Sequence, residues 1–208
     1  KIKLNFAKNL IKENNFDVAI FDSWKSLESF EKDKKLKKIC LVHGNEILKL
    51  NHSRRILSSL KNANHIVFNS IFTQKLFFKN FKKLPNYKFN IIYPAFIDIY
   101  EQKNLKKKYD LCTVARLEYR KGHHLVLESL FQLRNIHNLK LNYAILGNGP
   151  ELSKLRDLVM KLNLNKQVTF FEEDTKSSKI YNLSKIHIMP TISTPSSIEG
   201  FGISNVEA

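Results

Sequence analysis

Cysteine, glycine and long apolar runs are scarce in this sequence of 208 residues, and each shortage excludes a class of protein. The two cysteines, Cys40 and Cys112, are too few for a disulfide framework or a thiolate metal site. No uninterrupted apolar run approaches the roughly 18 residues that a membrane-spanning helix needs. With only 6 glycines, the chain also lacks the repeat of collagen. Collagen, coiled-coil, knottin and integral membrane proteins are therefore excluded.

The remaining composition is typical of a folded domain. Hydrophobic residues make up 43% of the chain and aromatic residues 11%, which is enough for a sizeable core and too much for a disordered chain. Charged residues make up 26%, an ordinary share for a folded protein. At about 150 residues per domain, the length predicts between one and two domains.

The charge is strongly positive and unevenly divided. The 35 Lys and Arg against 19 Asp and Glu give +16; residues 1–100 carry +11 of this and residues 101–208 carry +5. Such a field attracts nucleic acid, anionic lipid or phosphorylated ligands. A Lys- and Asn-rich bias on solvated surfaces explains the charge equally well, because the lysines are scattered through every polar stretch.

The two ends of the sequence predict a fragment of a longer chain. Lys1 is not an initiator methionine, and residues 1–15 lack the apolar centre of a signal peptide. Residues 202–208 have the pattern of a helix that is cut off. Because no export signal is present, we expect a cytoplasmic protein, with association to a membrane surface as a second expectation.

Short apolar segments alternate with amphipathic stretches along the whole chain. Strands are predicted at 17–21, 38–43, 65–68, 89–93, 111–115, 141–146, 168–171 and 186–189. Helices are predicted at 51–62, at 70–81 with Ser70 as N-cap, at 122–136, and from Pro150 onward. This alternation predicts an α/β fold with parallel sheets made of βαβ units.

A polar stretch divides the alternating pattern into two series. We expect a partial Rossmann-like lobe at 1–100, a linker at 101–108 with three consecutive lysines, and a second partial lobe at 109–208. Two doubly wound lobes joined by a linker form a cleft, and ligands of such lobes bind at the carboxyl ends of the strands. The candidate residues below all follow predicted strands.

The first candidate loop follows the strand at 111–115 and carries Arg116 and Lys121 just before a helix. Two cations beside free helix N–H groups suit a diphosphate. The alternative is a surface loop with ordinary solvated charges.

The second candidate loop is Gly147-Asn148-Gly149. Its glycines permit a tight turn and close approach of a ligand to the backbone. The alternative is a simple turn.

The third candidate segment, 198–207, holds two glutamates with a Gly-x-Gly turn after the first. Glu199 would lie at the mouth of the loop and Glu207 on the helix that follows. Carboxylates there suit sugar hydroxyls, which donate hydrogen bonds to them. The N–H groups near residues 202–204 suit an anionic oxygen. The alternative is a solvent-facing helix with acidic residues near its start.

A fourth candidate is His43, at the end of a predicted buried strand. It could face the cleft, although a lone histidine is more often a structural residue. The other histidines show no metal-ligand spacing and no partner set of cysteines or carboxylates. No metal site is therefore expected.

Together these segments resemble glycosyltransferase family 4, the retaining nucleotide-sugar transferases of the GT-B fold. The resemblance lies in the patterns "GRL…KG" at 115–122, "G.GP…L" at 147–152 and "EGFG…EA" at 199–208, the last with two glutamates separated by seven residues. It covers 109–208 and extends weakly back to about residue 17. It implies an enzyme that moves a sugar from a nucleotide-diphosphate sugar to a glycan or lipid-linked acceptor, such as a cell-envelope polysaccharide.

The resemblance also implies roles for matching positions. Arg116 and Lys121 would hold the donor diphosphate, Glu199 the donor sugar and Glu207 the nucleoside ribose, and His43 would face the donor sugar. The residues implied in donor binding through their turns are Gly147, Asn148, Gly149, Gly200, Phe201, Gly202, Ile203 and Ser204. No metal and no cofactor are implied, because the cations would replace the metal.

Departures from the family pattern and competing functions qualify this expectation. The family's opening strand, its Gly-rich acceptor loop and the segment after Ala208 are absent, and Ala115 stands where Gly is common. We therefore expect the fragment to be inactive by itself.

The alternatives to a glycosyltransferase are a GT-B sugar-nucleotide epimerase, a basic nucleic-acid-binding protein, or a peripheral membrane module.

Two of these alternatives depend on aromatic residues. Most aromatic residues fall inside apolar segments, which disfavours stacking on nucleic acid, and no nucleic-acid partner is expected. The basic stretch 77–84 is aromatic as well, and Phe77, Phe78 and Phe81 are expected to insert into an anionic membrane surface.

Overall fold

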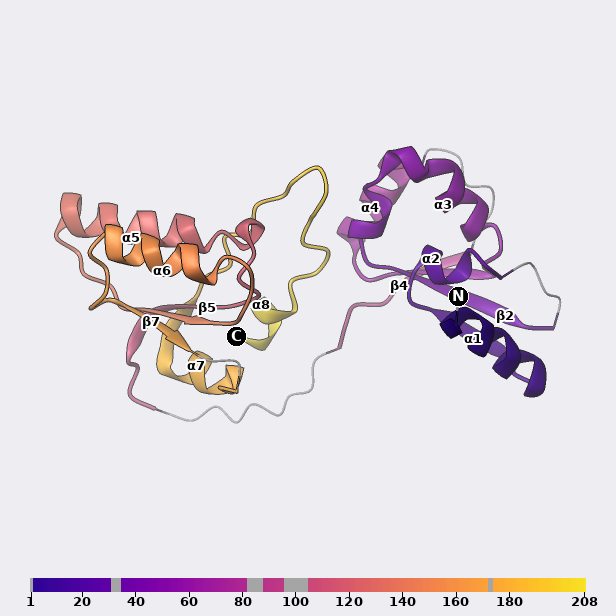
Figure 1. The fold of residues 1–208 in the computed structure, drawn as a ribbon, viewed down its shortest axis with the longest axis horizontal. Helices are drawn as coiled ribbons and strands as arrows, with labels where there is room; N and C mark the ends of the chain where they lie inside the picture. The colour runs from indigo at the N-terminus through magenta and orange to yellow at the C-terminus, as the bar shows by residue number, and fades with distance from the viewer. Residues whose placement is uncertain (1, 31–34, 82–87, 96–104, 172–173) are drawn as a thin grey trace. The chain divides into compact units, whose positions relative to one another are not determined.

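The computed structural model describes residues 2–30, 35–81, 88–95, 105–171 and 174–208 (Figure 1). The chain divides into two compact units. The first consists of Lys1–Pro94 and Pro195–Phe201, and the second of Ala95–Thr194 and Gly202–Ala208. The first four residues of the predicted linker lie outside the described residues, and residues 105–108 have no regular secondary structure.

The first unit is built on a four-stranded parallel sheet in the order β1-β2-β3-β4. Its elements are α1 (Ile2–Glu13), β1 (Val18–Phe21), α2 (Trp24–Leu27), β2 (Lys37–Val42), η1 (Asn45–Ile47), η2 (Leu50–His52), α3 (Ser53–Leu60), β3 (His65–Phe68), α4 (Ile71–Asn80) and β4 (Lys88–Ile91). In register, Phe21 pairs with Cys40 and Cys40 with Ile66, which forms one apolar row across the sheet.

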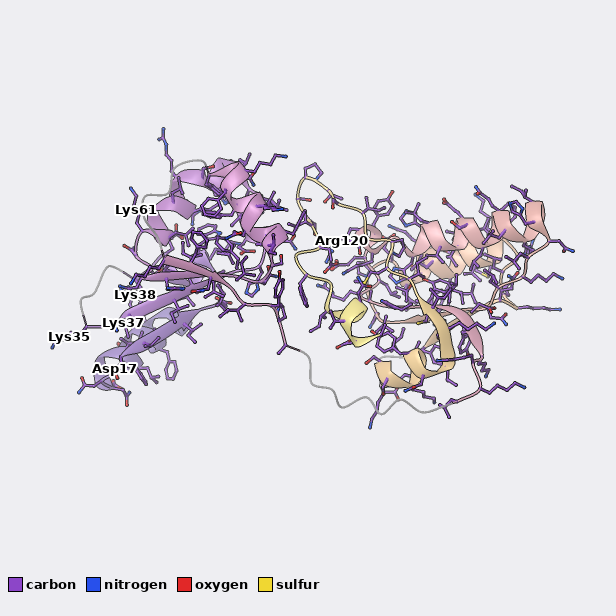
Figure 2. All side chains as sticks on the ribbon, turned by 180° about the vertical axis from the view of Figure 1, so that it is seen from behind. Asp17, Lys35, Lys37, Lys38, Lys61 and Arg120 are labelled. Carbon is purple, nitrogen blue, oxygen red and sulfur yellow. The ribbon has the colours of Figure 1, made fainter. Side chains whose placement is uncertain are left out.

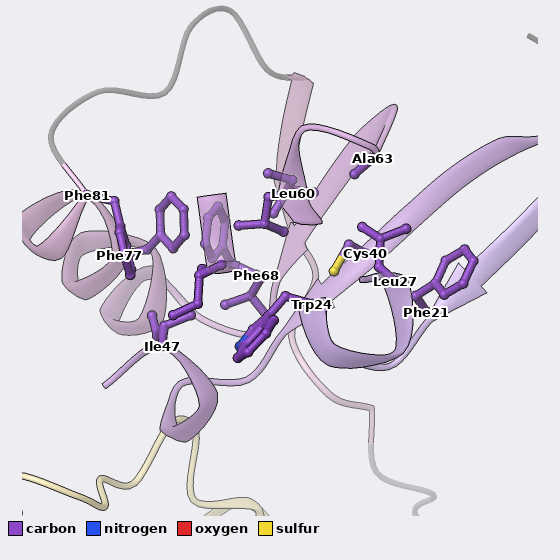
Figure 3. Packing of buried hydrophobic residues seen from close by; sticks show 13 residues of the cluster. Phe21, Trp24, Leu27, Cys40, Ile47, Leu60, Ala63, Phe68, Phe77 and Phe81 are labelled. Carbon is purple, nitrogen blue, oxygen red and sulfur yellow. The ribbon is translucent and has the colours of Figure 1, made fainter. Parts of the chain in front are cut away.

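The core of the first unit is aromatic and lies between the sheet and its helices (Figure 3). Trp24 and Phe68 are 1% and 0% exposed, and the Phe68 and Phe77 rings lie 5.4 Å apart. Phe77 and Phe81 belong to the same cluster and are 0% and 3% exposed. The expectation that Phe77, Phe78 and Phe81 insert into a membrane is therefore wrong, because two of the three hold the core together.

The second unit is doubly wound. Its sheet has four parallel strands in the order β7-β6-β5-β8. Its elements are β5 (Tyr109–Val114), η3 (Tyr119–Lys121), α5 (His123–His137), β6 (Tyr143–Leu146), α6 (Leu152–Lys161), β7 (Val168–Phe171), α7 (Ser177–Leu183), β8 (Ser184–His187) and α8 (Ile203–Glu207). The strand order reverses between β5 and β8, and this switch point is where α/β sheets bind ligands.

Both faces of the second sheet are covered, as β6 shows. Tyr143 and Ile145 point into a cluster with residues of α5 and α6, whereas Ala144 and Leu146 point into a cluster with Ile180 of α7. Figure 1 shows α5 and α6 side by side on one face and α7 on the other. The predicted α/β class with two parallel-sheet lobes is confirmed, and the second lobe has the strand-order reversal of a doubly wound sheet.

Local differences from the sequence prediction have local causes. The helix expected to open at Pro150 begins at Leu152, because the N–H of Glu151 donates to the carbonyl of Leu117 at 3.0 Å and holds a turn. The strand expected at 186–189 is β8, which begins at Ser184 directly after α7. Ser70 caps α4 as predicted, its hydroxyl accepting from the N–H of Thr73 at 3.0 Å. Among the described residues, no helix has both the length and the hydropathy to cross a bilayer.

Candidate functional site

The loop after β5 places two cations differently. Arg116 is exposed, and its guanidinium lies 2.8 Å from a carboxylate oxygen of Glu118. Lys121 closes the short helix η3 and is only 7% exposed. Gly122 follows with a left-handed φ of 73°, and a Cβ there would meet the carbonyl oxygen of Pro190 at 2.1 Å. The turn that sets the start of α5 therefore requires glycine.

The loop after β6 is packed directly on the loop after β5. A Cβ on Gly147 would lie 2.0 Å from the carbonyl oxygen of Ala115, and one on Gly149 would lie 2.5 Å from that of Leu117. The Leu117 N–H donates to the carbonyl of Asn148 at 2.9 Å. The two loops therefore form one surface at the carboxyl ends of neighbouring strands.

A third loop, after β8, joins the same edge of the sheet. The Thr113 hydroxyl donates to the carbonyl of Ile188 at 2.7 Å, and the Ile192 N–H donates to the carbonyl of Arg120 at 2.7 Å. Because β5 and β8 flank the point where strand order reverses, these bonds line the switch point of the sheet. Arg116, Lys121 and the Gly147–Gly149 turn thus lie on loops that contact one another.

The short helix α8 is tied to the same unit. Gly202 is its N-cap with a left-handed φ of 79°, and the Ser204 Oγ lies 2.8 Å from the sulfur of Met189 in the loop after β8. The Tyr181 hydroxyl lies 3.3 Å from both the Ser204 carbonyl oxygen and Glu207 Oε2. Tyr181 of α7 therefore orients the Glu207 carboxylate.

A buried histidine adjoins the buried lysine at the start of α5. His123 is 1% exposed, and neither of its ring nitrogens has a hydrogen-bond partner among the described residues. Burial, followed by the charges of Lys121 and His124, lowers the pKa of His123 to about 4. The ring is therefore neutral near pH 7, which leaves Lys121 as the buried cation of this turn.

The remaining predicted residues lie in the first unit. His43 directly follows β2 and is exposed. Its N–H and that of Gly44 donate to the two carboxylate oxygens of Glu46, at 2.6 and 3.0 Å. Its carbonyl oxygen accepts from the side-chain amide of Asn69 at 3.2 Å. The backbone at His43 is therefore held on both sides, while its imidazole stays accessible.

The segment Pro195–Phe201, which carries Glu199, packs on this part of the first unit. The Ile198 N–H donates to Asn45 Oδ1 at 2.7 Å, and the Ser70 hydroxyl donates to the carbonyl of Gly200 at 2.6 Å. A Cβ on Gly200 would lie 2.2 Å from the carbonyl oxygen of His43. The structure thus brings the backbone around His43 and Glu199 together within the first unit, whereas Arg116, Lys121 and Glu207 belong to the second.

Three positioning residues were not found from the sequence. Asn45 and Ser70 hold the segment with Glu199, and Tyr181 orients Glu207. Ser70 had a sequence signal as a helix cap and, with Asn69, as a weak part of the family resemblance, whereas nothing in the spacing of Asn45 or Tyr181 indicates a partner more than 20 residues away. Long-range partners of this kind are visible only in three dimensions.

The described residues offer few side chains that could bind a metal ion or act as a reactive thiol. Within the described ranges, no group of three or more His, Cys, Asp or Glu side chains is placed to hold a metal ion. Both cysteines are buried free thiols, and burial raises the pKa of Cys40 to about 12. A thiol with such a pKa is not a nucleophile near neutral pH.

The two lobes have the GT-B fold of solved glycosyltransferases. A variant of S. aureus TarM, solved with fondaparinux, alpha-GlcNAc-glycerol and UDP, is 17% identical with a TM-score of 0.75, and the match covers 98% of this chain and 41% of that one. HepE of Anabaena, solved with UDP and glucose, is 17% identical with a TM-score of 0.75 over 97% of this chain and 59% of that one. The pneumococcal O-GlcNAc transferase GtfA, solved with UDP and GlcNAc, is 15% identical with a TM-score of 0.73 over 99% and 43%.

The sequence itself identifies the family. Residues 96–208 match the model of the glycosyl transferases group 1 family, and the chain belongs to that family. A search of curated proteins by sequence found no match. The chain spans about two fifths to three fifths of the length of the solved structures named above.

Proposed function

We propose that this protein is a retaining, metal-independent glycosyltransferase of family 4, and that the 208 residues are part of a longer chain. It would transfer a sugar from a nucleotide-diphosphate donor to a glycan or lipid-linked acceptor of the cell envelope, on the cytoplasmic side. Membership of the glycosyl transferases group 1 family and the GT-B fold support transfer of a sugar. UDP in the three similar structures makes uridine diphosphate sugars the first donors to test.

The observation that carries this proposal is the hydrogen-bonded cluster of loops at the switch point of the second sheet. It puts an exposed guanidinium, Arg116, and a buried ammonium, Lys121, on one edge. A departing nucleoside diphosphate gains negative charge in the transition state, and preorganised cations stabilise that charge most where water is excluded. Lys121 suits this role because its side chain is largely shielded from water.

The glycine turn and α8 supply complementary contacts for the donor. Gly147 and Gly149 let their turn pack on the loop after β5, which brings backbone beside Arg116 where it would contact the diphosphate or sugar. Glu207, oriented by the Tyr181 hydroxyl, can accept hydrogen bonds from two ribose hydroxyls. The turn through Gly202, Ile203 and Ser204 would add backbone N–H groups.

The groups in the first unit are proposed to act on the donor sugar. Glu199 would accept hydrogen bonds from sugar hydroxyls, and His43, Gly200 and Phe201 would line the same position. The anchoring of this segment by Asn45 and Ser70 supports the proposal, since positioning a reacting sugar requires a rigid backbone.

The test combines donor binding with product analysis on the whole protein. A UDP-sugar at 100 times its Kd should stabilise the protein by about 2.7 kcal/mol in a thermal-shift assay. The Glu207→Ala variant, which lacks a contact proposed for the bound donor, should lose part of that stabilisation. NMR of the product should show the anomeric configuration of the donor. Absence of stabilisation by any nucleotide sugar, or an inverted product, would contradict the proposal.

A further inference from the structure

The first unit contains a polar pocket that none of the roles above uses. It has a volume of about 310 Å³ and is lined by residues that follow the first two strands and by Ser196. Trp24 and Lys25 begin the helix after β1, and Asn45 and Glu46 begin η1 after β2. The pocket therefore lies at the carboxyl ends of parallel strands, where α/β sheets bind ligands.

The walls of the pocket are held rigidly. The Trp24 indole N–H donates to the carbonyl of Glu46 at 2.9 Å, and both carboxylate oxygens of Glu46 are taken by backbone N–H groups of His43 and Gly44. Asn45 holds the segment with Ser196 through the N–H of Ile198. The pocket is thus preformed, which lowers the entropic cost of binding.

The pocket carries an excess of positive charge. Lys25 and Lys49 line it with exposed side chains, against the single carboxylate of Glu46, each oxygen of which accepts one backbone N–H. The nearby Arg55 adds nothing to this excess, because Glu28 neutralises it with two hydrogen bonds of 2.8 Å. An anion entering the pocket would therefore meet two mobile ammonium groups.

One lining side chain also has unused hydrogen-bonding capacity. His52 Nδ1 is buried and has no hydrogen-bond partner among the described residues. An unpaired buried polar atom is costly, and a small turn of the imidazole toward a ligand hydroxyl or anionic oxygen in the pocket would remove that cost. The volume lies at the lower end of the range for small-molecule sites, which suits a single sugar unit.

The geometry points to a site for an anionic sugar unit, one that carries a phosphate ester or a carboxylate, held by Lys25, Lys49 and His52. That this ligand is the acceptor of the transferase rests on the proposed function, whereas the existence of the binding site does not. The acceptor of this transferase is then an acidic glycan, and its charged unit is held in the first unit of the protein. Phosphate and carboxylate share the chemistry that the two lysines recognise.

The fluorescence of Trp24, which lines the pocket, can report binding at this site. Trp24 is the only tryptophan, and the Lys25 Nζ lies 5.9 Å from its ring centroid. Movement of this ammonium toward an anion changes the field at the indole and thus its emission. Titration with glucose 6-phosphate, with glucuronate and with glucose, followed by tryptophan fluorescence, should give a saturable change. At least one of the two anionic sugars should bind about tenfold or more tightly than glucose.

Matched lysine variants separate the site from the general positive field. Lys25→Gln and Lys49→Gln should each raise the Kd of the bound anionic sugar by about 3- to 10-fold. Lys61→Gln should leave it within about twofold, because Lys61 lies at the opposite end of the sheet, with Lys35, Lys37, Lys38 and Asp17 near the starts of β1 and β2 (Figure 2). All three substitutions remove one charge from the same unit.

Several results would overturn the inference. These are a linear response without saturation, equal affinity for glucose and both anionic sugars, and equal weakening by Lys61→Gln. Calorimetry with UDP on the same samples tests the donor site independently. If UDP does not bind but the fluorescence response is saturable, the proposed function is contradicted and the anionic-sugar site is supported. If UDP binds but the fluorescence response is absent, only the anionic-sugar site is contradicted.

Discussion

The Ser70 hydroxyl donates a hydrogen bond to the carbonyl of Gly200 at 2.6 Å, although 130 residues separate the two in the sequence. The same oxygen accepts the N–H of Thr73 and caps α4. One side chain therefore starts a helix of the first unit and anchors the segment that carries Glu199. Loss of this hydroxyl should affect both the stability of the protein and the order of that segment.

Ser70→Ala should lower the free energy of unfolding by about 1–2 kcal/mol, since it removes a helix cap and a buried hydrogen bond. Urea denaturation measures this change. Hydrogen exchange should also become faster at Ile198, whose N–H is held by Asn45. Ser58→Ala, at an exposed position of α3, is the control and should change stability by no more than about 0.5 kcal/mol. Equal effects of the two substitutions would contradict the dual role.

Gly147→Ala should destabilise the second unit by about 2 kcal/mol or more. Gly147 has a φ of 147°, and its new Cβ would lie 2.0 Å from the carbonyl oxygen of Ala115, so backbone must move. Thermal unfolding checks this. Asn148→Ala, which removes an exposed side chain from the same turn, should cost about 1 kcal/mol or less. A fully stable Gly147→Ala protein would mean that the two loops do not pack closely.

Kinetics should separate the roles proposed for the four charged residues of the donor site. Arg116→Ala and Lys121→Ala should each lower kcat by about 10²–10³, by analogy with the loss of one oxyanion donor, and Glu199→Ala should act similarly. Glu207→Ala should mainly raise KM for the donor, because a ribose contact is present in both ground and transition states. Arg156→Ala removes an exposed cation from α6 and should leave both parameters near wild type.

The same kinetic assay tests metal independence. A chelator should leave wild-type activity unchanged, and added divalent metal should not rescue the Arg116 or Lys121 variants. Activity that a chelator abolishes would contradict a diphosphate held by the protein's own cations.

Stability should fall in mild acid because of His123. The folded protein lowers the pKa of this residue from 6.5 to about 4, so between these values the unfolded chain binds a proton that the folded chain does not. The free energy of unfolding should therefore fall as the pH drops from about 6.5 to 4, by up to about 3 kcal/mol. Urea denaturation over this range measures the loss.

His123→Leu should remove most of this acid-dependent loss, since it removes the buried group that must take up the proton. A smaller part should remain from His187, whose pKa burial also lowers. His124→Gln, which changes the neighbouring ring stacked on Tyr119, should retain the loss. If His123→Leu keeps the full acid sensitivity, the burial of His123 is not its cause.

Much of the fold follows from local patterns in the sequence. The predicted strand segments all appear, and the cap at Ser70 forms as expected, because hydrophobic periodicity and capping depend on residues a few positions apart. The loops with Arg116, Lys121 and Gly147 could be found for the same reason: each directly follows a recognisable strand. The family resemblance rests on these local motifs.

Only the tertiary structure decided which of those local features meet. The apolar pattern at 70–81 cannot show that Phe77 and Phe81 face the core, because that depends on Phe68 and the sheet beside them. The packing of Pro195–Phe201 on Asn45 and Ser70, and the pocket beside Trp24, depend on contacts across more than 100 residues of sequence. Such contacts leave no periodic signal, since each is fixed by how whole sheets and helices pack.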